Sequence, residues 1–119
     1  MSPILVTAWA RAFALAVMVE LLVATPLLGR GHSRARRAAA VALGQLITHP
    51  LVWFVFSALP LSRVPYLAIA EGWAVAGEAM LYALVFLDLP RLQVFAASAL
   101  ANAASFAAGT ALGALTSWF

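Results

Sequence analysis

Apolar residues fill four long stretches of the chain, and short segments rich in Gly, Pro and charge separate them. The stretches cover roughly residues 4–28, 38–59, 66–87 and 92–118. Each is close to the ~20 residues with which an α-helix crosses the hydrocarbon core of a bilayer. Helix-breaking residues stand in all three connectors: Gly29, Gly31, Pro60, Pro65 and Pro90. The pattern predicts an all-α polytopic membrane protein, with four transmembrane helices in one compact antiparallel bundle, residues 1–119.

Composition excludes most other classes of protein. Hydrophobic residues make up 66% of the chain and charged residues 9%, against about half and about a quarter in a typical soluble domain. Seven basic and four acidic side chains are too few to cover the surface of a soluble globule. Cysteine is absent, which excludes a disulfide scaffold and any thiolate metal site. We also expect no nucleic-acid partner, because most of the positive charge lies in a single connector.

The distribution of arginine predicts the orientation in the membrane. Five arginines lie in or beside the first and third connectors: Arg30, Arg34, Arg36, Arg37 and Arg91. The second connector holds only Arg63. The positive-inside rule therefore places the first and third connectors in the cytoplasm and both termini outside, which we expect to be at a bacterial inner membrane. Trp9, Trp53, Trp73 and Trp118 then fall in the outer half. Arg30, Arg34, Arg36 and Arg37 are expected to meet anionic lipid headgroups.

Seven polar or ionisable residues lie inside the predicted spans: Arg11, Glu20, Gln45, His49, Glu71, Glu78 and Asn102. A charge at the bilayer centre costs about 2.5–3.5 kcal/mol on insertion scales, so such residues are expected to turn inward and to mark a functional site. Glu71 and Glu78 are seven residues apart and share one helix face with Tyr82. Gln45 and His49 are four apart on another helix.

These spacings predict one internal cluster. His49, Glu78 and Asn102 form its centre at mid-membrane, with Gln45 and Tyr82 on the cytoplasmic side. An ion pair between Arg11 and Glu71 is expected to cap the cluster on the outward side. Glu20 has no obvious partner in the chain, and we leave open whether it is protonated, reaches toward the membrane surface or contacts another subunit.

The leading functional hypothesis is binding or transport of a small cation, either a proton or a divalent metal ion. Glu78 is the expected carboxylate, and His49 is its proton partner or fellow metal ligand. We expect the chain to act as a homo-oligomer or with a partner membrane subunit. One alternative is a structural or assembly subunit, in which Glu20 pairs with a basic residue of the partner. The other is an intramembrane enzyme acting on lipid, although no nucleophile signature supports it and a role other than catalysis is favoured.

Overall fold

The computed structural model describes residues 1–116, and four long helices account for most of them. Their bounds are α1 Pro3–Leu27, α2 Arg34–Phe54, α3 Arg63–Val85 and α4 Arg91–Leu115, with a short 3₁₀ helix, η1 Phe56–Ala58, after α2. All four long helices have the length and apolar composition that a membrane span requires. The predicted all-helical fold with four such helices is therefore confirmed. Trp118 lies outside the described residues.

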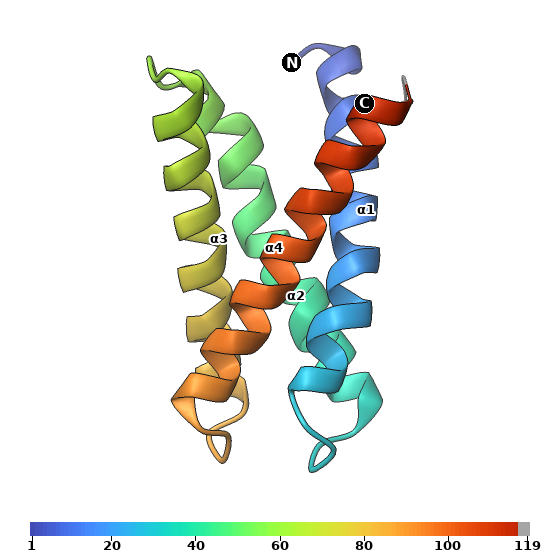
Figure 1. The fold of residues 1–119 in the computed structure, drawn as a ribbon, viewed down its shortest axis with the longest axis vertical. Coiled ribbons are helices and arrows are strands. Elements are labelled where there is room, and N and C mark those ends of the chain that lie inside the picture. The colour runs from blue at the N-terminus through green and yellow to red at the C-terminus, as the bar shows by residue number, and fades with distance from the viewer. Residues whose placement is uncertain (117–119) are drawn as a thin grey trace.

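The helices form a four-cornered bundle in chain order (Figure 1). α1 packs against α2, α2 against α3 and α3 against α4, and α4 closes the bundle against α1. Helices α1 and α3 are therefore diagonal to each other. The α1–α2 and α3–α4 loops lie at one end of the bundle, here called the loop end. The N-terminus, the α2–α3 connection and the C-terminal end of α4 lie at the other, here called the terminus end.

Helix α2 begins earlier than the apolar pattern predicts. It starts at Arg34 and not near residue 38, because Ser33 caps it: the Ser33 Oγ accepts a hydrogen bond of 3.1 Å from the backbone N–H of Arg36. The hydropathy pattern misses this turn because its residues are basic. Upstream, Gly29 has a φ of 81°, a backbone conformation that glycine adopts without steric cost, and it lets the chain reverse after α1.

Many small residues lie between the helices, and many large apolar residues lie on the outer surface of the bundle. Small residues such as Ala24, Ala97 and Ala101 are buried, whereas Leu22 and Leu84 are 76% and 67% exposed. Large apolar side chains on the outer surface and small ones between the helices are typical of packing in lipid, where the hydrophobic effect does not bring helices together. The exposed leucines therefore give these helices an outer surface suited to lipid.

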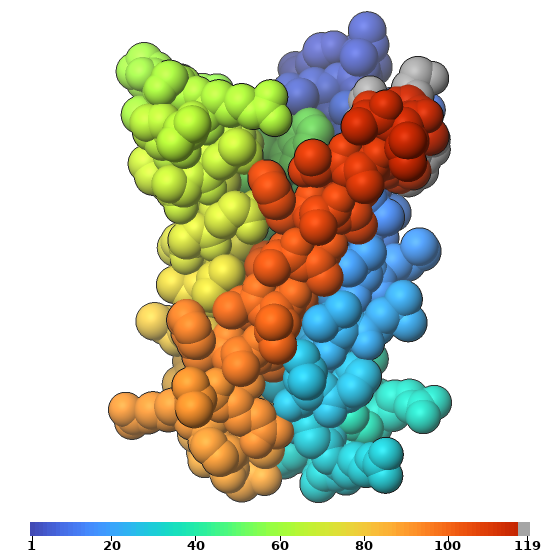
Figure 2. Space-filling model, viewed as in Figure 1, coloured from blue at the N-terminus to red at the C-terminus, as the bar shows by residue number. Residues whose placement is uncertain are grey.

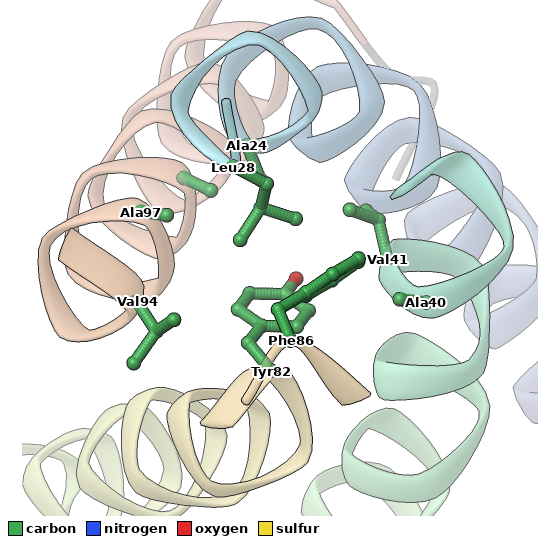
Figure 3. Packing of buried hydrophobic residues seen from close by; sticks show 9 residues of the cluster. Ala24, Leu28, Ala40, Val41, Tyr82, Phe86, Val94 and Ala97 are labelled. Carbon is green, nitrogen blue, oxygen red and sulfur yellow. The ribbon is translucent and has the colours of Figure 1, made fainter. Parts of the chain in front are cut away.

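An apolar cluster fills the bundle near the loop end. Tyr82 and Phe86 of α3 project into the centre and meet Leu28 and Val41 (Figure 3). At the terminus end the helices diverge, with α2 and α3 on one side and α1 and the end of α4 on the other (Figure 1). Figure 2 shows the surface hollowed at this end, between the α2–α3 connection and α4. Apolar side chains thus fill the bundle at the loop end, and the helices lie farther apart at the terminus end.

Candidate functional site

Glu78 of α3 is the centre of a buried hydrogen-bond network. Its Oε1 accepts hydrogen bonds from Gln45 Nε2 at 2.8 Å and from Thr48 Oγ1 at 3.0 Å, both on α2. Its Oε2 accepts one of 2.9 Å from Asn102 Nδ2 on α4. Glu78 is 0% exposed. Each oxygen of this carboxyl group therefore has at least one donor, and all the donors are neutral.

Glu20 of α1 is the second buried acid of the network. It is 1% exposed, and its Oε1 accepts a hydrogen bond of 3.1 Å from Ser105 Oγ of α4. Its Oε2 is buried and has no hydrogen-bond donor among residues 1–116. Glu20 lies close enough to Glu78 for the two carboxyl groups to interact directly. Two buried acids therefore meet in the interior. Both oxygens of Glu78 accept hydrogen bonds, whereas Oε2 of Glu20 accepts none within residues 1–116.

Helix α4 links the two acids. Asn102 donates to Glu78 and also to the backbone carbonyl of Ser98, at 2.9 Å in both cases. One turn along, Ser105 Oγ lies 3.1 Å from both Glu20 Oε1 and the Asn102 carbonyl oxygen, and its single hydrogen serves one of them at a time. Ser98 donates to the Val75 carbonyl at 2.8 Å, which fixes α4 against α3. The stripe of polar residues on α4 therefore holds the diagonal pair in register.

A cavity of about 610 Å³ lies between the helices in the half of the bundle that carries the termini. Its deep end is lined by members of the network: Glu20, Gln45, Thr48, Asn102 and Ser105. Its walls are mostly apolar, and Arg63 and Tyr66 at the start of α3 line its outer part. Glu20 and the residues that donate hydrogen bonds to Glu78 thus form the floor of a cavity, and the apolar cluster around Tyr82 and Phe86 closes the bundle beyond them.

His49 lines this cavity but lies apart from the Glu78 network. Its ring packs against aromatic rings, with centroids 5.5 Å from Phe13 and 6.1 Å from Trp53. No hydrogen bond joins His49 to Glu78 in the described part of the chain, and its buried Nδ1 has no partner there. Gln45 and Thr48 of the same helix donate to Glu78, where the helical spacing had predicted His49.

The predicted metal ligands His49 and Glu78 are not joined by a third acidic, His or Cys ligand in residues 1–116. No group of three or more His, Cys, Asp or Glu side chains suited to a metal ion occurs there. The amide groups of Gln45 and Asn102 turn their nitrogens, not their oxygens, toward Glu78. The residues present therefore suit a proton better than a divalent ion.

The remaining predicted site residues lie around this centre. Tyr82 is completely buried one turn from Glu78, toward the loop end, and its hydroxyl has no partner among the described residues. Glu71 is half-buried and lines the cavity. Arg11 is exposed on α1, diagonal to the α3 helix that carries Glu71. The Arg11–Glu71 ion pair stays a prediction.

Polar contacts join the two loops at the loop end. His32 Nε2 and Asp88 Oδ1 are 2.7 Å apart, and this contact connects the α1–α2 loop to the α3–α4 loop. Hydrogen bonding to His32 lowers the pKa of the exposed Asp88 carboxyl. Arg36 donates to the carbonyl of Val85 at 3.0 Å, and Arg37 donates to that of Thr25 at 2.7 Å. Two of the four clustered arginines thus satisfy carbonyls at helix C-termini, which helices leave without intrahelical donors.

The network contains one residue and one contact that the sequence did not indicate. Thr48 donates to Glu78, and Glu20, for which no partner was predicted, meets Glu78 and accepts a hydrogen bond from Ser105. Thr48 follows Gln45 by three residues, which is as compatible with a shared helix face as the spacing of His49. No protein family, curated protein or solved structure matches this chain.

Proposed function

We propose that this protein is an integral membrane protein that binds and transports a small cation, and that Glu20, on the floor of the cavity, and Glu78, behind that floor, together hold one proton. The observation that carries the proposal is the meeting of two fully buried carboxyl groups whose donors are all neutral. Two like charges this close in a low-dielectric interior cannot both persist. One proton, or one other monovalent cation, brings the pair to a single negative charge.

The hydrogen bonds favour one location for the proton. Three donors already point at Glu78, an arrangement that stabilises an ionised carboxylate. Within residues 1–116, Glu20 accepts a hydrogen bond on Oε1 from Ser105, and its buried Oε2 has no donor. A proton on Glu20 Oε2 that is donated to Glu78 satisfies the bare oxygen and removes the second charge.

The position of the pair favours transport over a purely structural role. Hydrogen bonds between membrane helices contribute about 0.6 kcal/mol each on average, and amides supply them at a lower insertion cost than carboxyl groups do. The floor of a cavity is where a proton can exchange with water on one side. The apolar cluster beyond it separates the acids from the loop end. Such an arrangement corresponds to one state of a protein that opens to the two sides in turn.

The hypothesis of an assembly subunit depended on Glu20 having no partner within its own chain. Ser105 and Glu78 both interact with Glu20, so a second subunit is not needed to explain this acid. For an enzyme, the hydroxyl groups of Ser98 and Ser105 are the available nucleophiles. Both donate to oxygen acceptors, and neither has a hydrogen bond to His49 among the described residues.

The orientation and the lipid contacts belong to the same proposal. The arginine count favours a cytoplasmic loop end, so the cavity faces outward in this state. Arg30 and Arg34 are exposed and line a small hollow with Arg37, where an anionic lipid headgroup finds positive charge.

Reconstitution of the full chain into vesicles with a trapped pH-sensitive dye tests the proposal. The decay of an imposed pH gradient is followed with the proton alone and with small inorganic or organic cations added outside. We expect the wild type to speed the decay in at least one condition, and Glu20→Gln and Glu78→Gln to abolish that effect. Asp88→Asn, a matched acid-to-amide change outside the spans, should retain it. A wild type no faster than empty vesicles in any condition, or an unchanged Glu78→Gln, would contradict the proposal.

A further inference from the structure

The cavity is far larger than a proton requires. Its volume of about 610 Å³ lies within the range of about 300–1,000 Å³ that is typical of small-molecule sites. Glu20 is 1% exposed and lines this cavity, and its buried Oε2 has no donor among residues 1–116. A buried acid beside a cavity of this size indicates a ligand with a positively charged group that can take the place of the shared proton.

The walls indicate the rest of the ligand. Four rings line the cavity between the network and the mouth: His49, Trp53, Tyr66 and Phe106. The other wall residues are chiefly Ala, Leu, Val and Gly, which offer few hydrogen bonds. Such walls suit apolar groups, and aromatic faces also attract cations. A sugar or another ligand with many hydroxyl groups would leave its polar atoms without partners.

The charges around the cavity favour a positive ligand. Glu20 on α1 and Glu71 on α3 line it directly, and Glu78 lies behind its floor. Arg63 near the mouth is the one arginine among the lining residues in the described chain, and the lining residues of α4 are all uncharged. The other titratable groups that face this region are His49, Tyr66 and Tyr82. Acids therefore outnumber bases from the mouth to the floor.

We infer that the cavity binds a small organic ammonium ion with an apolar or aromatic substituent, and that its charge replaces the proton shared by Glu20 and Glu78. This inference rests on the proposed function and names its cargo. The exchange balances: one ammonium ion enters and one proton leaves to water, so the two carboxylates and the bound ion together keep a single net negative charge. The rings of Trp53 and Phe106 then surround the ligand, and the carboxyl group of Glu20 faces its nitrogen, with Glu78 behind it.

Binding to the full chain in lipid nanodiscs tests the inference with a matched pair of probes. Benzyltrimethylammonium carries a fixed charge and no exchangeable proton, and neopentylbenzene is its neutral isostere. Calorimetry in two buffers of different ionisation enthalpy gives both the affinity and the number of protons released. We expect the ammonium ion to bind at least about tenfold more tightly than the isostere and to release close to one proton. Its affinity should rise with pH by up to about tenfold per unit, the limit for exchange of one proton.

Matched variants localise the site. Trp53→Leu should weaken binding of the ammonium ion several-fold, whereas Trp73→Leu should leave it unchanged, because Trp73 does not line the cavity. Equal affinity for the two probes would mean an apolar cavity that lipid chains also fill, and this result overturns the inference, as does the absence of binding. If the probe fails to bind while Glu78-dependent decay of the pH gradient persists, the inference falls and the proposed function stands. Binding without proton release or pH dependence contradicts the exchange itself.

Discussion

Glu20 and Glu78 interact across the diagonal of the bundle, from two helices that do not pack against each other. Asn102 and Ser105 of α4 hydrogen-bond to one acid each and hold the pair together. Because the acids come from α1 and α3, any motion that separates these helices also separates the carboxyl groups. If the pair binds a cation as proposed, we expect binding to be coupled to the opening of the bundle.

The approach of α2 to α3 depends on glycine at two positions. A Cβ at Gly44 would lie 3.1 Å from Glu78 Cγ, and one at Gly77 would lie 3.1 Å from Thr48 Cγ2. Glu78 and Thr48 are held by hydrogen bonds and cannot move aside without breaking them. We expect Gly44→Ala and Gly77→Ala each to lower the free energy of unfolding by about 1–3 kcal/mol, the usual cost of overpacking.

Gly72→Ala is the matched control for these substitutions. It lies on the same helix as Gly77, and a Cβ there meets nothing within 4 Å. Equilibrium unfolding in detergent should place Gly72→Ala at or above the wild type. Losses of similar size in all three variants would mean that the close approach is not the cause.

Orientation in the membrane can be mapped with single cysteines, because the natural chain has none. Gly31→Cys in the α1–α2 loop and Ser62→Cys in the α2–α3 connection are both exposed positions. A membrane-impermeant thiol reagent added to intact cells should label Ser62→Cys and leave Gly31→Cys unlabelled until the cells are opened. The reverse result would place the cavity on the cytoplasmic side.

The contact between His32 and Asp88 gives the loop end a dependence on pH. The folded-state pKa of Asp88 is lowered, so this contact stabilises the fold above the ordinary pKa of Asp and is lost as pH falls through the lowered value. Asp88 is the only Asp in the chain, so selective labelling gives a single carboxyl signal in a nuclear magnetic resonance titration. In His32→Ala we expect the pKa of Asp88 to move up toward its ordinary value, because His32 is the main cause of the shift. An unmoved pKa would assign the shift to other neighbours.

The sequence predicted where the helices lie along the chain far better than it predicted which residues of each helix face the interior. Apolar length alone located the four spans, since each exceeds what a bilayer requires. The seven-residue spacing of Glu71 and Glu78 gave their common face correctly, but it did not show that Glu78 is buried and Glu71 only half-buried. That difference arises because the bundle is plugged at one end and widened at the other.

The sequence did not predict which residues of different helices contact one another. Thr48 and His49 flank the same face of α2, and a small rotation of that helix decides which of them meets Glu78. The sequence predicted no partner for Glu20, because Ser105 and Glu78 lie 85 and 58 residues farther along the chain, on other helices. Such contacts depend on how the helices close into a bundle, which no single helix pattern specifies.

Infrared spectroscopy of carboxyl groups tests the shared proton most directly. At neutral pH the wild type in nanodiscs should show the C=O band of a protonated carboxyl group. Glu20→Gln should remove this band, because Glu78 keeps its three donors and stays ionised. Glu78→Gln should shift it, because Glu20 then loses a charged acceptor. Glu71→Gln should leave the band in place, and a wild type without the band, or a band unchanged in Glu20→Gln, would contradict a proton shared by Glu20 and Glu78.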